Sequence, residues 1–217
     1  MNDIIIAPSL LAADYLNLSS DLRRLDLSGG DWIHYDVMDG KFVPEISFGE
    51  GILRKLKKET ALPVDVHLMI NEPLSSIESF KEAGADRITF HLESTKKVSE
   101  TIEKIHALQL PAGIAIRPET PVEKVFPYIP FVEMVLVMTV SPGFGGQPFL
   151  PESPERIKAV RQEAERVNPE LLLQVDGGIN LSTVRTAFDS GANVFVSGSA
   201  LFKGDLKENV NKMRSIL

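Results

Sequence analysis

The sequence predicts a single (β/α)8 barrel, and three features of the chain support that prediction. Short runs rich in branched apolar residues alternate with longer amphipathic segments along all 217 residues. No linker or shift in composition interrupts this alternation, so we expect one domain over residues 1–217. Histidines and carboxylates gather near the ends of the apolar runs, and a barrel of this kind carries its active site at the C-terminal ends of its strands.

The individual elements follow from residue type and spacing. Runs of β-branched residues predict strands at 4–7, 32–37, 64–69, 87–91, 112–116, 134–139, 172–175 and 194–196. Apolar residues at three- and four-residue spacing predict helices at 16–28, 49–58, 74–83, 96–108, 121–128, 154–167, 181–190 and 206–216.

Composition restricts the class of partner. The chain has 23 basic and 30 acidic residues, a net charge of −7, which argues against nucleic acid as a partner. It has no cysteine, so any metal must be held by histidine or carboxylate ligands. The apolar stretch at 4–13 is interrupted by Pro8 and Ser9, which is typical of neither a signal peptide nor a membrane span. We therefore expect a cytoplasmic protein without membrane association.

Four residues form a candidate metal site. His34 and Asp36 lie two apart on one expected strand and therefore share a face, His67 lies on the next, and Asp176 follows a strand far along the chain. Two imidazoles and two carboxylates suit zinc, iron, manganese or cobalt. We expect all four side chains at the C-terminal ends of their strands.

Glycine-rich segments at 141–147, 176–179 and 197–202 follow the last three expected strands. Loops in these positions of a barrel commonly bind phosphate through backbone N–H groups, although glycines also serve ordinary turns. Met38, Met69 and Met138 end three strands. They are interpreted either as core filler or as an apolar lining above an electron-rich intermediate.

Six motifs run in order along almost the whole chain: APSLLAADY, HYDVMDGKFVP, DVHLM, MTVSPGFGGQPF, VDGGIN and SGSALF. They resemble the successive motifs of the ribulose-phosphate 3-epimerase family. The resemblance implies a metal-dependent epimerase of the pentose phosphate pathway that interconverts D-ribulose 5-phosphate and D-xylulose 5-phosphate through an enediolate. It also implies one divalent metal per chain, with zinc expected first, and a homo-oligomer, either dimer or hexamer.

The same resemblance implies roles for individual residues. His34, Asp36, His67 and Asp176 match the metal ligands, and Asp36 and Asp176 are the expected acid and base, since inversion at a carbon needs proton transfer on both faces. The three methionines are expected to cap the enediolate. The expected contacts to the phosphorylated ketose are Ser9, His67, Gly143, Phe144, Gly145, Gly146, Gly177, Gly178, Gly198 and Ser199.

Four residues depart from the family pattern, namely Glu45, Arg117, Ser141 and Gln174. Arg117 is expected either near the pocket rim, paired with Glu45, Glu93 or Glu119, where it would alter substrate preference, or directed to solvent beside Glu119. An allulose-6-phosphate 3-epimerase is the nearest alternative function, although that pattern reads GFAGQ and lacks the second glycine of DGG. A phosphosugar decarboxylase would place a lysine two residues after the strand aspartate, where this chain has Met38. A non-catalytic sugar-phosphate sensor is the remaining alternative.

Overall fold

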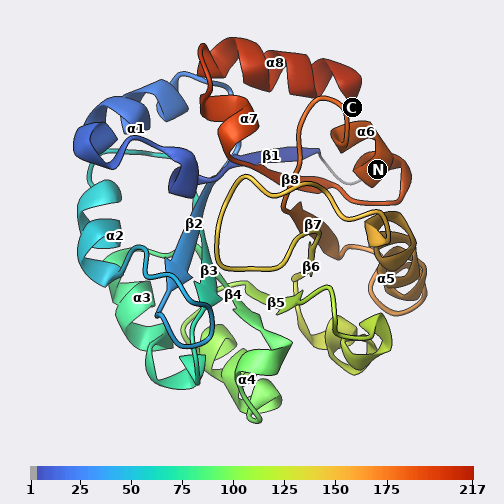
Figure 1. The fold of residues 1–217 in the computed structure, drawn as a ribbon. Helices are drawn as coiled ribbons and strands as arrows, with labels where there is room; N and C mark the ends of the chain where they lie inside the picture. Colours follow the sequence, from blue (N-terminus) through green and yellow to red (C-terminus); the bar gives the residue numbers. More distant parts are fainter. Residues whose placement is uncertain (1–3) are drawn as a thin grey trace.

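The computed structural model describes residues 4–217, which form an eight-stranded barrel surrounded by helices. Viewed down the barrel axis, the strands stand in a central ring and the helices lie outside it (Figure 1). The strands are β1 (Ile5–Pro8), β2 (Ile33–Met38), β3 (Val64–Met69), β4 (Arg87–His91), β5 (Ala112–Ile116), β6 (Met134–Met138), β7 (Leu172–Asp176) and β8 (Val194–Ser197). The predicted fold class is confirmed.

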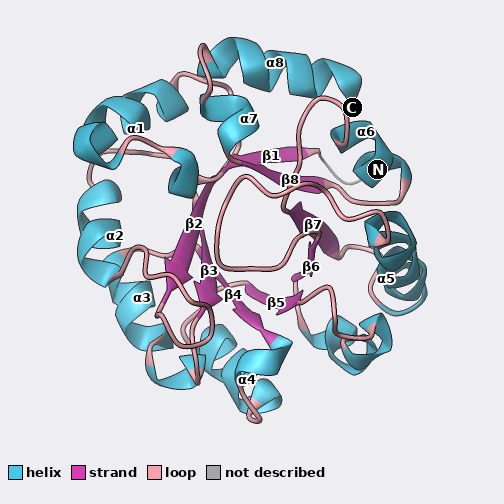
Figure 2. Ribbon diagram, viewed as in Figure 1, coloured by secondary structure: helices cyan, strands magenta, loops and turns pink. Residues whose placement is uncertain are grey.

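All eight strands run parallel, in the order β1-β8-β7-β6-β5-β4-β3-β2 (Figure 2). The remaining seam between β1 and β2 is bridged by a parallel pairing of Ser9 with His34, which brings the sheet close to full closure. Because the strands are parallel, their C-terminal ends form one rim, and the loops that follow them meet over the same opening.

The helices cover the outside of the barrel. Their apolar residues recur at helical spacing and turn toward the sheet: in α5, for example, Ile157, Val160 and Ala164 are buried. The α-helices are α1 (Leu18–Asp26), α2 (Glu50–Leu56), α3 (Ile77–Ala83), α4 (Val98–Ala107), α5 (Ser153–Val167), α6 (Val184–Asp189), α7 (Ser199–Phe202) and α8 (Leu206–Ile216). None of the helices in residues 4–217 is long and apolar enough to span a membrane.

The helix predicted over 121–128 is wrong. The chain there forms two 3₁₀ segments, η5 (Val122–Lys124) and η6 (Phe126–Phe131). Pro127 and Pro130 lack the N–H that a continuous α-helix would need at these positions. Shorter 3₁₀ segments also precede or follow several elements: η1 (Leu10–Ala12), η2 (Tyr15–Asn17), η3 (Pro73–Ser75) and η4 (Leu92–Ser94).

The two faces of the barrel wall have different contents. Outward residues such as Ile6, Tyr35 and Phe90 pack under the helices in the main apolar core. At the N-terminal end an apolar cluster around Trp32 and Met134 fills the barrel, and the Arg87 guanidinium lies 3.7 Å from the centre of the Trp32 ring. Toward the C-terminal rim the inner face becomes polar, with fully buried histidine, aspartate, threonine and glutamine side chains. This change in polarity positions the candidate site.

Candidate active site

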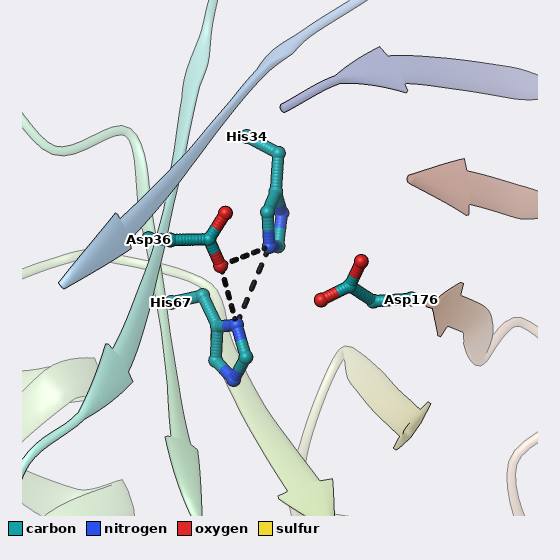
Figure 3. Close-up of side chains that lie close together, drawn as sticks. All are labelled: His34, Asp36, His67 and Asp176. Atoms are coloured by element: carbon teal, nitrogen blue, oxygen red, sulfur yellow. Dashed lines mark hydrogen bonds and ion pairs between the residues drawn. The ribbon is translucent and has the colours of Figure 1, made fainter. Parts of the chain in front are cut away.

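Four side chains predicted as metal ligands converge inside the C-terminal half of the barrel (Figure 3). His34 and Asp36 come from β2, His67 from β3 and Asp176 from the end of β7. Each offers one nitrogen or oxygen, and these four atoms all lie within 4.8 Å of one another. Residues separated by more than a hundred positions thus meet at one point because the barrel brings β2, β3 and β7 around a common axis.

His34 does not lie at the C-terminal end of its strand, contrary to the sequence prediction. It is the second residue of β2, paired in register with Asp65, whereas Asp36 is paired with His67 one layer higher. The His34 imidazole spans the layer between them, and its Nε2 lies 3.2 Å from Asp36 Oδ1 and 3.3 Å from His67 Nδ1. Its Nδ1 lies 2.9 Å from Asp65 Oδ2.

Asp36 is held by three neighbours. Its Oδ2 accepts a hydrogen bond of 2.7 Å from the Ser9 hydroxyl, and its Oδ1 lies 3.0 Å from His67 Nδ1. Burial disfavours the charge on Asp36, but the imidazoles of His34 and His67 outweigh burial and hold the pKa of Asp36 below its usual range. Burial also opposes a cation at His34, yet the carboxylates of Asp36 and Asp65 raise the pKa of His34 well above its usual value.

Asp176 faces this group from the opposite side of the barrel (Figure 3). Burial, reinforced by the negative charge of Asp36, raises the pKa of the Asp176 carboxyl to about 6. Neither Asp36 nor Asp176 forms an ion pair with a lysine or arginine within residues 4–217. Two carboxylates that face each other, one almost fully and one partly buried, are expected to be costly without a cationic side chain.

The four residues fit a divalent cation. Their donor set, two imidazole nitrogens and two carboxylate oxygens, matches that of zinc and similar metals. A cation at their meeting point would offset the repulsion between the two carboxylates. It would also accept lone pairs from His34 Nε2 and His67 Nδ1, which otherwise face each other.

A cavity of about 1130 Å³ opens above this cluster, on the side of the C-terminal rim. Asp36 and Asp176 line it, while His34 and His67 lie beneath. Every predicted contact residue other than His67 also lines it: Ser9, Gly143, Phe144, Gly145, Gly146, Gly177, Gly178, Gly198 and Ser199. Met38, Met69 and Met138 are almost fully buried and contribute apolar patches to its wall.

The long segment at 139–152, gold in Figure 1, crosses the mouth of the barrel between β6 and α5. It packs closely on the loop after β7. A Cβ at Gly177 would lie 2.3 Å from the Val140 side chain, and one at Gly178 would lie 2.3 Å from the Phe149 backbone nitrogen. These two glycines are therefore required by the packing of one loop on the other, independently of any ligand.

Arg117 does not pair with any of the three expected glutamates. Its guanidinium lies 4.0 Å from the centre of the Phe42 ring, and its Nη2 donates a 2.7 Å hydrogen bond to the Phe42 carbonyl. Stacking on an aromatic ring, together with this hydrogen bond, stabilises a cation without a carboxylate. Of the candidates, Glu93 contacts only the Arg117 backbone N–H, which donates to its Oε1 at 2.9 Å.

The other departures lie in different places. Glu45 lines the cavity, whereas Ser141 is exposed beside Glu119. Gln174 is fully buried below the cluster, where its amide donates a 2.6 Å hydrogen bond to Asp65 Oδ2. That oxygen also faces His34 Nδ1, so Gln174 helps to hold Asp65 against a predicted metal ligand.

Sequence reasoning missed a third histidine. His91 ends β4, is fully buried, and its Nε2 lies 2.9 Å from His67 Nε2. Burial lowers the pKa of His91 to about 4. The signal was present in the sequence, since His91 closes a strand-like run just as Asp176 does. No comparable signal indicated its partner Glu93, which lies in the loop that follows.

The chain is similar to known proteins over almost its whole length. The model of the ribulose-phosphate 3 epimerase family matches residues 5–202. Ribulose-phosphate 3-epimerase of Treponema pallidum is 44% identical over 202 residues, which cover 93% of each chain. The enzyme of the same name from Bacillus subtilis is 40% identical over 213 residues, covering 97% of this chain and 98% of that protein.

Among solved structures, 3-keto-L-gulonate-6-phosphate decarboxylase from Vibrio cholerae has a similar fold. The TM-score is 0.70 over 100% of this chain and 97% of that chain, at 12% sequence identity. At this identity the likeness concerns the barrel alone.

Proposed function

This chain belongs to the ribulose-phosphate 3-epimerase family and is an epimerase, and on that premise we propose that it interconverts D-ribulose 5-phosphate and D-xylulose 5-phosphate. The observation that carries the proposal is the convergence of Asp36 and Asp176 from opposite sides of the barrel onto the floor of one cavity. Inversion at C3 requires one group to remove a proton from one face of the carbon and another to return a proton to the other face.

The two aspartates are unequal, as such a reaction requires. In the metal-free protein the neighbouring imidazoles hold the pKa of Asp36 below its usual range, whereas burial and the charge of Asp36 raise the pKa of Asp176 to about 6. In one direction Asp36 would remove the C3 proton and Asp176 would supply one. In the reverse direction the roles exchange, so a single arrangement serves both substrates.

His34, Asp36, His67 and Asp176 would hold one divalent cation per chain, with zinc as the first candidate and iron, manganese or cobalt as alternatives. When bound, such a cation supplies positive charge against the negative charge that develops on a substrate oxygen as the C3 proton leaves. The Ser9 hydroxyl holds Asp36 Oδ2, which leaves Oδ1 directed to the histidines.

Backbone N–H groups of the glycine loops around 143–146, 177–178 and 198–199 would bind the substrate phosphate. Met38, Met69 and Met138 would exclude water from the enediolate. The loop at 139–152 would close over the bound sugar and shield it further. A homo-oligomer, dimer or hexamer, and a cytoplasmic location stay predictions.

The proposal is tested by measuring turnover of the purified protein on ribulose 5-phosphate and on allulose 6-phosphate side by side. We expect the ratio of kcat/KM values to favour the pentose phosphate clearly. A higher kcat/KM for the six-carbon substrate would replace the proposed substrate by the alternative one. If neither substrate exchanges its C3 proton with solvent deuterium, the chain lacks this activity.

A further inference from the structure

The hydrogen bonds around His67 extend away from the proposed metal position through a second imidazole. His67 Nδ1 faces Asp36 Oδ1 at 3.0 Å, and His67 Nε2 faces His91 Nε2 at 2.9 Å. His91 Nδ1 in turn lies 3.3 Å from Glu93 Oε2. His67 and His91 are fully buried, whereas the Glu93 side chain is 22% exposed.

Glu93 can only accept hydrogen bonds when ionised, and its surroundings keep it so. Its Oε1 accepts from the Arg117 backbone N–H and from the Thr120 hydroxyl, which leaves Oε2 facing His91. Because a carboxylate has no proton to donate, the proton in the His91–Glu93 contact must lie on His91 Nδ1. The opposite nitrogen of a neutral imidazole, His91 Nε2, then carries a lone pair.

This arrangement determines the proton on His67. His91 Nε2 can only accept, so the 2.9 Å contact requires a proton on His67 Nε2. His67 Nδ1, on the other side of the ring, faces Asp36 Oδ1 and His34 Nε2, and a cation bound there would take its lone pair. At His34, Asp65 faces Nδ1, so Nε2 is the nitrogen directed toward Asp36 and His67.

We propose that His91 and Glu93 are positioning residues, which fix the proton of His67 on Nε2 so that Nδ1 is available to the cation. This inference rests on the proposed metal site. His91 is also held in place by packing, because the Phe42 ring lies 4.9 Å from the His91 ring. The Arg117 guanidinium stacks on Phe42, and the Arg117 backbone N–H fixes Glu93. Of these two contacts, only the stacking depends on the departure at Arg117.

The position of the proton is measured directly by nitrogen-15 spectra of the histidine rings. The chain has only four histidines, so each ring can be assigned by substitution. In the metal-free protein we expect His91 to carry its proton on Nδ1, and this preference should disappear in Glu93→Leu. A His91 proton on Nε2, or an unchanged His91 spectrum in Glu93→Leu, would overturn the proposal whether or not a metal binds.

The consequence for metal binding is measured by competition with a chelator. His91→Leu should weaken zinc binding about 10- to 100-fold, the usual effect of removing a residue that supports a ligand. His91→Gln should restore most of the affinity, because its amide oxygen can accept the proton of His67 Nε2. Glu133→Gln is the matched control, since Glu133 pairs with the exposed His106 at 3.1 Å, remote from the site.

Equal zinc affinity in His91→Leu and the wild type would contradict the proposal, as would equal losses in His91→Leu and His91→Gln. If the wild type itself fails to bind zinc, the proposed metal site is wrong. In that case the ring spectra still decide where the His91 proton lies. Failure of the proposed metal site and failure of the proposed role of His91 are therefore distinguishable.

Discussion

The floor and the roof of the cavity are built in opposite ways. The floor consists of His34, Asp36, His67 and Asp176, which stand on strands; the three from β2 and β3 are almost fully buried and each has a polar neighbour within 3.3 Å. The roof is the segment at 139–152, where Phe144 is 51% exposed and a Cβ at Gly145 would meet nothing within 4 Å. Its main internal tie is the Gln147 amide, which donates to the carbonyls of Ser141 and Phe144.

We therefore expect the floor to carry out the proton transfer and the roof to affect how the substrate is bound. Each floor residue stands on a strand, and neighbouring polar groups fix the orientation of its side chain. Small changes in the floor are therefore expected to have large effects. The ends of the roof pack on the loop after β7, but its middle, around Phe144 and Gly145, is exposed and has space around it. Changes in the roof should alter how substrate is bound, and should leave the proton transfer itself largely intact.

The largest effect is expected in the floor. Asp36→Asn and Asp176→Asn each remove a proton-transfer group and a proposed metal ligand, so kcat should fall ~10²–10⁴-fold in each variant. Activity is compared at matched metal content, with the exposed Asp189→Asn as control. Either variant retaining more than about a tenth of wild-type turnover would refute the two-aspartate mechanism.

The protons of the floor should also control metal binding. In the metal-free protein burial and Asp36 raise the pKa of Asp176 to about 6, and the pKa of His34 is raised well above its usual value. A cation binds the deprotonated forms, so apparent affinity should rise with pH, by at least about tenfold per unit below pH 6. Chelator competition across pH 5 to 7 measures this slope. An affinity independent of pH would show that neither group is a ligand that must lose its proton.

A smaller effect is expected in the roof. Gly145→Val adds a side chain where the structure leaves space, and should raise KM for the phosphorylated sugar by up to about tenfold, with kcat changed less. Gly145 is a cleaner test than Gly146, whose φ of +78° would strain any other residue. Identical steady-state constants in Gly145→Val and the wild type would mean that this part of the roof does not contact the substrate.

The smallest effect is expected for Arg117→Asn. The guanidinium stacks on Phe42, donates to its carbonyl, and lines no part of the cavity. The ratio of kcat/KM values for pentose and hexose phosphates should therefore stay within about twofold of wild type. A larger change in this ratio would show that Arg117 determines substrate preference, as first expected from the sequence.

The floor was largely predictable from the sequence, because pairs such as His34 and Asp36 share one strand face and the barrel brings strand ends together. Strand boundaries at 64–69, 87–91 and 112–116 agree with the structure. The depth of His34 was not predictable, since it depends on how strand β2 pairs with β3. The prediction of a glutamate partner for Arg117 was wrong, because an aromatic ring and a backbone carbonyl leave no charge pattern in the sequence.

The central claim is that the floor holds a cation required for proton transfer at C3. The most direct test strips the protein of metal, verifies this by elemental analysis, and follows exchange of the substrate's C3 proton with solvent deuterium. We predict that exchange falls more than about tenfold and returns when one equivalent of zinc per chain is added. Exchange at the full rate in protein shown to be free of metal would contradict the account.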